Sequence, residues 1–114
     1  MPVTELEEPF RTAVYEAMVF VARGPELEEW EFHTRMGIYR PELEDALSRW
    51  PELSDADRDS PDFLAVNNSL NEVCHGLPIS DEQWREWFTV EPEIVAGAYR
   101  RWALSVGLER RGIQ

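Results

Sequence analysis

The sequence predicts an all-α fold, a compact bundle of about five to six short helices. Apolar residues recur at intervals of three and four along most of the chain, as they do on the inward faces of helices. Prolines and serines stand where such helices would begin, and glycines where they would end. The 114 residues, 43% of them hydrophobic, are typical of one folded domain over 1–114 and too apolar for a disordered acidic tail.

The first two helices are predicted over 9–23 and 26–36. A proline suits the first turn of the first helix, and a Gly-Pro pair follows its last residue. Gly37 ends the second helix. A short strand is the alternative for part of this stretch, because apolar and polar residues also alternate through Trp30, Phe32, Thr34 and Met36.

The third helix is predicted over 41–50, and the turn-forming residues of 51–61 predict a loop. A fourth helix follows and extends to Gly76. Its apolar residues step by three and four along one face, and they are Phe63, Val66, Leu70, Val73 and Leu77.

A fifth helix is predicted after Ser80, because Gln83 stands three residues on and completes a capping box. The last helix is predicted from Pro92 to Gly107. We expect the five tryptophans to supply large buried surfaces, each on the order of 200 Å².

The chain is strongly acidic. It has 23 acidic residues and 11 arginines, no lysine, and a formal net charge of -12. Residues 1–93 hold 22 acids and 7 arginines, a balance of -15, which argues against nucleic-acid or anionic-membrane binding and points to a basic partner. Residues 94–114 have a balance of +3, because Glu109 faces Arg100, Arg101, Arg110 and Arg111. We expect these arginines to neutralise carboxylates and the C-terminal end of the last helix, with an anion-binding patch as the alternative.

The sequence predicts a cytoplasmic protein. Cys74 is the only cysteine, so no disulfide can form within the chain. The first residues lack the basic and apolar segments of a signal peptide, and no apolar run approaches the roughly 18 residues that cross a bilayer. The use of arginine without lysine suggests GC-rich bacterial coding.

Residues 29–49 resemble a helix-turn-helix unit. Gly37 lies at the turn, and the residues expected to pack the two helices together are Phe32, Met36, Ile38, Leu43 and Ala46. His33 stands where such units usually have a small residue. The second helix would begin Pro-Glu-Leu-Glu-Asp, and its carboxylates would meet DNA phosphates spaced at about one charge per 1.7 Å. We therefore expect a helix-turn-helix geometry that does not bind DNA.

Three aspartates, Asp55, Asp57 and Asp59, have the opening spacing of an EF-hand calcium loop. Val66 occupies the twelfth position, where a bidentate glutamate is required, so an EF-hand is excluded. A solvated acidic loop is the preferred interpretation, and a looser cation site is the alternative.

No enzyme, metal site or cofactor is predicted. Glu72 and His75 have the spacing of half a di-iron site, but the chain lacks a second such pair. Adjacent helical residues point about 100° apart, so Cys74 and His75 do not form a nucleophile and base. The chain has no Gly-rich phosphate loop and no Gly-x-Ser-x-Gly turn.

The fourth predicted helix carries a polar face opposite its apolar stripe. On it, Asn68, Asn71, Glu72 and His75 follow one another at helical spacing. Asparagine is a poor helix former, so this face either belongs to a buried hydrogen-bonded network or contacts a partner.

These observations favour a small acidic protein-interaction module that occludes a basic partner, as an inhibitor, antitoxin, immunity protein or nucleic-acid mimic does. Carboxylates would steer association, and exposed tryptophan or tyrosine and the polar face would anchor it. The predicted contact residues are Glu26, Glu28, Glu29, Glu42, Glu44, Asp45, Asn68, Asn71, Glu72 and His75. The alternatives are a degenerate helix-turn-helix regulator that binds DNA through its arginine-rich end, and a structural or oligomerising subunit; a homodimer is left open.

Overall fold

A computed structural model describes residues 2–108, which form seven α-helices and one π-helical turn, with no strand among them. The elements are α1 (Pro2–Glu5), α2 (Phe10–Arg23), α3 (Glu29–Met36), α4 (Arg40–Arg49), α5 (Pro61–Asn71), η1 (Glu72–Gly76), α6 (Asp81–Trp87) and α7 (Pro92–Ser105). The predicted all-α fold is confirmed. The strand alternative for 30–36 is wrong, because that stretch is helical.

Several helix ends lie where their capping residues predicted them. The Ser80 hydroxyl accepts the N–H of Gln83 at 3.1 Å, and the Gln83 side chain accepts the N–H of Ser80 at 3.1 Å. Ser60, which lies in the predicted loop, also caps a helix, because its hydroxyl accepts the N–H of Asp62 at 3.0 Å ahead of α5. Gly37 ends α3 with φ 73°, a left-handed conformation that glycine adopts without the steric cost of a Cβ.

Three elements differ from the prediction. The second predicted helix begins at Glu29 and not at residue 26, because residues 24–27 form bends and Glu28 caps the helix. The four residues of α1 are too few to show helical periodicity in the sequence. The fourth predicted helix divides, because α-helical bonding ends at Asn71 and the N–H of Leu77 reaches back five residues to the carbonyl of Glu72 at 2.8 Å. This wider π-helical turn shifts the side chains of η1 away from the faces that α-helical spacing assigns.

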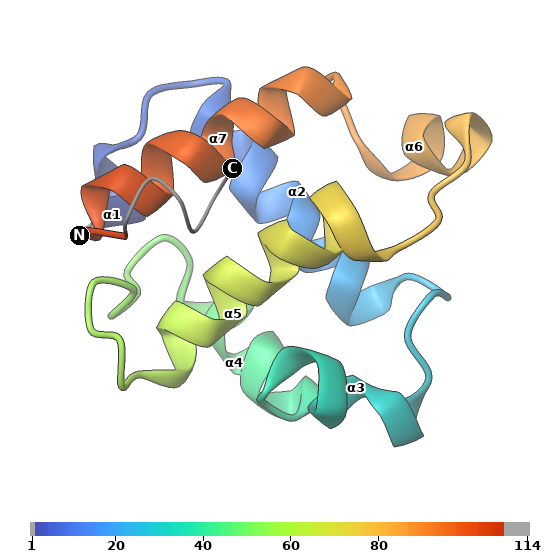
Figure 1. Ribbon diagram of the computed structural model, residues 1–114, viewed down its shortest axis with the longest axis horizontal. Coiled ribbons are helices and arrows are strands. Elements are labelled where there is room, and N and C mark those ends of the chain that lie inside the picture. Colours follow the sequence, from blue (N-terminus) through green and yellow to red (C-terminus); the bar gives the residue numbers. More distant parts are fainter. Residues whose placement is uncertain (1, 109–114) are drawn as a thin grey trace.

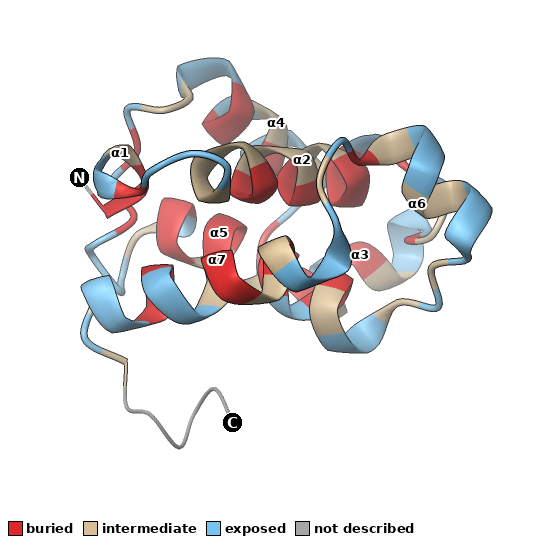
Figure 2. Cartoon of the chain, turned by 90° about the horizontal axis from the view of Figure 1, so that it is seen from above, coloured by how far each residue is buried: buried red, intermediate tan, exposed pale blue. Residues whose placement is uncertain are grey.

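The core surrounds α2, which packs most extensively against α7 and also against α5 and α4 (Figure 1). The sides of α2, α5 and α7 that face one another carry buried residues (Figure 2). The largest fully buried side chains include Trp102, Phe20, Phe32 and Met18. Among the described residues, no helix combines the length and apolar character needed to cross a membrane.

The tryptophans do not all contribute to this core. Trp102 is fully buried, whereas the side chain of Trp30 is 78% exposed. The expectation of a large buried surface is therefore wrong for Trp30, because α3 turns Phe32 and Met36 toward the core instead.

Asp55 is fully buried, so the expected solvated loop of three aspartates is wrong at this position. Its Oδ2 accepts the indole N–H of Trp102 at 2.9 Å and the backbone N–H of Val3 at 3.1 Å. Asp57 and Asp59 remain exposed. Burial raises the pKa of Asp55, and its carboxylate joins the 51–60 loop to α1 and α7.

Candidate functional site

An exposed aromatic surface lies on α3 and the turn that follows it. The side chains of Trp30 and Tyr39 are 78% and 61% exposed. The Tyr39 ring stacks on the imidazole of His33, with centroids 4.1 Å apart and planes 17° from parallel. Trp30 and His33 are three residues apart and share one face of the helix. We call Trp30, His33 and Tyr39 the aromatic patch.

The local sequence explains why this patch faces solvent. Phe32 and Met36 are four residues apart, so their burial fixes the inward side of α3. The turn over 37–39 then leads into α4, where Oε1 of Glu42 accepts the N–H of Tyr39 at 2.8 Å. This bond fixes the backbone that carries the Tyr39 ring.

Residues 29–49, predicted to resemble a helix-turn-helix unit, fold as α3, a three-residue turn and α4. All of the residues expected to pack this unit are buried, and they are Phe32, Met36, Ile38, Leu43 and Ala46. His33 does not disturb that packing, since it lies on the exposed side. The exposed residues of α4 include Glu42 and Asp45, so a DNA backbone approaching this helix would meet carboxylates.

Three of the predicted contact carboxylates on α3 and α4 are neutralised by arginines, in the pairs Glu29–Arg40, Glu44–Arg23 and Asp45–Arg49. The Glu44 pair is bidentate, with N···O distances of 3.1 and 3.0 Å. The hydrogen bond from Arg23 lowers the pKa of Glu44. These three carboxylates are therefore less available to a partner than the sequence implied.

Two other predicted carboxylates border the aromatic patch. Oε2 of Glu28 accepts the indole N–H of Trp30 at 3.2 Å, and Glu42 bonds the backbone of Tyr39. Both glutamates are exposed. Glu26 lies nearby in the chain but is half-buried, and its carboxylate accepts the side-chain amide of Gln83 at 2.5 Å.

The four polar residues predicted on one helical face do not form one surface. Asn68 donates to the carbonyl of Met36 at 2.8 Å and so caps the C-terminal end of α3. Glu72 is buried and pairs with Arg35, with Nη2 2.6 Å from Oε1. Asn71 and His75 are exposed. The face divides because α3 covers part of it and because the π-helical turn redirects the chain after Asn71.

Gly76 makes room for the buried ion pair. A Cβ at this position would lie 2.6 Å from Oε1 of Glu72 and 2.9 Å from Nη2 of Arg35. Arg35 also donates to the Gly76 carbonyl at 3.1 Å. Asn68 and Glu72 thus hold α3 against α5 and η1, and α3 in turn positions the aromatic patch.

The arginine-rich end is only partly described. Arg100 and Arg101 are exposed on α7, and the guanidinium of Arg101 lies 4.1 Å from the centroid of the Phe10 ring. Arg110 and Arg111, together with Glu109, lie outside the described residues.

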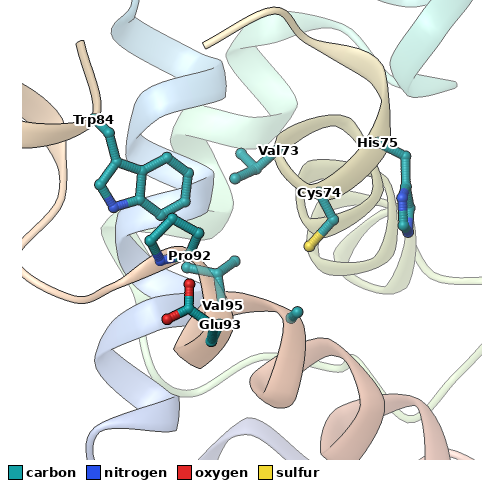
Figure 3. Close-up of a pocket in the computed structure, with 8 residues that line it drawn as sticks. Val73, Cys74, His75, Trp84, Pro92, Glu93 and Val95 are labelled. Carbon is teal, nitrogen blue, oxygen red and sulfur yellow. The ribbon is translucent and has the colours of Figure 1, made fainter. Parts of the chain in front are cut away.

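No group of three or more histidine, cysteine, aspartate or glutamate side chains is placed to hold a metal ion within residues 2–108. Burial raises the pKa of the Cys74 thiol to about 11. Figure 3 shows that thiol and the His75 imidazole as neighbours pointing in different directions.

Sequence reasoning expected an exposed tryptophan or tyrosine at the contact surface but did not identify Trp30 or Tyr39, because a tryptophan between apolar neighbours is usually assigned to the core. The available signal was register, since Trp30 and His33 lie off the face that carries Phe32 and Met36. No protein-family model, no curated protein and no solved structure matches the chain.

Proposed function

We propose that this protein is a small acidic interaction module that binds and occludes a basic partner protein through the aromatic patch, Glu28 and Glu42. The observation that carries the proposal is the exposure of Trp30 and Tyr39 on the acidic α3–α4 segment. Tryptophan and tyrosine are enriched among the residues that dominate binding energy at protein interfaces. Inhibitors, antitoxins, immunity proteins and nucleic-acid mimics are the classes that this description fits.

Charge supports a basic partner. Residues 26–45 contain seven carboxylates and two arginines. Both arginines are engaged within the fold, Arg35 with Glu72 and Arg40 with Glu29. The negative potential that remains would steer a basic surface toward α3 and raise the association rate.

The patch also suits the side chains of a basic partner. A guanidinium or ammonium group placed over an exposed tryptophan or tyrosine ring gains about 0.5–2 kcal/mol. Glu28 and Glu42 stand beside the two rings and would accept hydrogen bonds from the same groups. We expect the protein to act in the cytoplasm, where a lone thiol stays reduced.

Affinity capture with matched variants tests the proposal. The immobilised chain is incubated with a cell lysate, and its recovery of proteins is compared with that of Glu28→Gln/Glu42→Gln. A second double variant, Glu7→Gln/Glu52→Gln, removes the same charge from exposed positions away from the patch. We expect the unmodified chain and the second variant to recover the same basic protein, and the first variant to associate with it at least about threefold more slowly.

Three results would count against this function. The captured protein could be acidic, the two double variants could lose binding equally, or the chain could bind duplex DNA in a gel shift at low salt. The last result would favour the regulator alternative, which predicts affinity that falls steeply as salt rises.

A further inference from the structure

A groove lies between η1, α6 and the start of α7, away from the aromatic patch. Its volume is about 320 Å³, and apolar side chains form most of its wall. Figure 3 shows the indole of Trp84 on one side, the Cys74 thiol on the other, and Glu93 and Val95 of α7 between them. The lining residues are Val73, Cys74, His75, Trp84, Pro92, Glu93, Val95 and Ala96.

The groove is preformed because Trp84 is held in place. Its ring stacks on Phe88 with centroids 4.0 Å apart and planes 12° from parallel. Its indole N–H donates to the carbonyl of Val90 at 2.7 Å. Gln83 anchors α6 from the other side through Glu26. Figure 1 shows α6 projecting from the helical core. The hollow is lined by Trp84 of α6 and by residues of α7.

The groove continues past Trp84 into a second hollow of about 400 Å³. The two hollows share Trp84, Pro92 and Glu93, so they adjoin. The second hollow has a polar rim that includes Asp81, Glu91 and Arg85. The apolar wall of the first hollow is therefore continuous with the acidic rim of the second.

The charge of this rim is not balanced from within the described chain. Asp81, Glu91 and Glu93 are exposed, and none of them forms an ion pair with an arginine of residues 2–108. Arg85 is the one arginine that lines either hollow, and His75 lines the first, so the three carboxylates outnumber the arginines there. This differs from α4, where Glu44 and Asp45 are paired.

We propose that this groove binds a short segment of a protein that carries one apolar side chain between arginine or lysine residues. The apolar side chain occupies the hollow between Trp84 and Val95, and the basic residues lie against Asp81, Glu91 and Glu93. Apolar burial supplies affinity, and the carboxylates select a basic over a neutral or acidic sequence. This site is separate from the aromatic patch and does not depend on the function proposed for it.

Nuclear magnetic resonance titration of the full chain with the peptide Arg-Arg-Leu-Arg-Arg tests the site. We expect the Trp84 indole signal and the amide signals of α7 near Val95 to shift, and the Trp30 indole to shift less. Replacing the leucine of the peptide with glycine should weaken binding about tenfold, because burial of a leucine side chain is lost. Replacing the arginines of the peptide with glycine should weaken binding more than replacing the leucine does.

Protein variants separate the groove from general acidity. Asp81→Asn/Glu93→Gln should weaken binding about threefold or more. Glu82→Gln/Glu86→Gln, on α6 with Asp81 but outside the groove, should leave binding within about twofold of the native value. Ala96→Phe should fill the hollow and abolish binding, with an otherwise unchanged spectrum showing that the fold is intact.

The proposal is overturned if shifts map only to the aromatic patch, or if the two double variants weaken binding equally. It is also overturned if the peptide with glycine in place of leucine binds as tightly, or if a peptide without arginine does. The proposal is overturned as well if no signal of the protein shifts at millimolar peptide.

Discussion

Replacing Asp55 with alanine takes the hydrogen-bond acceptor away from two buried donors. Trp102 and Val3 are fully buried, and both donate to Oδ2 of Asp55. Each buried donor left without a partner costs about 1–3 kcal/mol, so the variant should lose about 2–6 kcal/mol in the free energy of unfolding. Urea unfolding followed by tryptophan fluorescence measures this loss.

Asp55→Asn separates the hydrogen bonds from the charge. The amide oxygen can still accept from both donors, so this variant should lose less than Asp55→Ala at pH 7. Comparing the stability of this variant with that of the native chain over a range of pH reports on the charge, because burial raises the pKa of Asp55 above its ordinary 3.8. Oδ1 of the native carboxylate has no hydrogen-bond partner in the described structure.

The sign of that dependence follows from proton linkage. A carboxyl whose pKa is higher in the folded state binds its proton more tightly there, so its contribution to stability is complete below pH 3.8 and is lost as the pH rises through the folded-state pKa. The stability of the native chain relative to Asp55→Asn should therefore fall over that interval and then level off. A loss of less than about 1 kcal/mol for Asp55→Ala would contradict the role of the hydrogen bonds. Equal losses of stability for the two variants would do the same. A difference in stability between the native chain and Asp55→Asn that does not change with pH would contradict the raised pKa.

Three further predictions concern stability and reactivity. Asp62→Asn should cost about 1–3 kcal/mol at pH 7, because it weakens the bidentate pair with Arg49 at 2.9 and 2.7 Å. Arg49 lowers the pKa of Asp62, so urea titrations should show the cost disappearing as the pH falls through its folded-state pKa, and a constant cost would contradict this. Gly37→Ala should lose about 1 kcal/mol in the same assay, because φ at this position is 73°, and an unchanged midpoint would exclude the strain. Cys74 should react with iodoacetamide at pH 8 about 100-fold more slowly in the folded than in the unfolded chain, since burial raises its pKa from 9.0 to about 11; equal rates would show an accessible thiolate.

Local chemistry predicted much of the fold. Ser80 with Gln83, and Gly37 at its left-handed turn, act over fewer than five residues, and such signals survive in the sequence. The apolar stripe that begins at Phe63 predicted the buried side of α5 for the same reason.

The missed features depend on distant partners. Asp55 is buried because a donor 47 residues away, on Trp102, needs an acceptor, and no local pattern encodes that pairing. Glu44 is neutralised by Arg23, 21 residues away, so counting carboxylates overstated the charge available on α4. The exposure of Trp30 likewise depends on which side of α3 meets α5.

We proposed that the aromatic patch binds a basic partner. The most direct test is to measure the affinity of the captured partner for the Trp30→Ala variant. Truncating an interface tryptophan that anchors binding costs about 2 kcal/mol or more, so Kd should rise at least about 30-fold. Leu104→Ala is the matched control, because Leu104 is 54% exposed on α7, outside the patch. We expect a Kd within twofold of the native value for Leu104→Ala. An unchanged Kd for Trp30→Ala, in a variant that unfolds at the native urea midpoint, would contradict it.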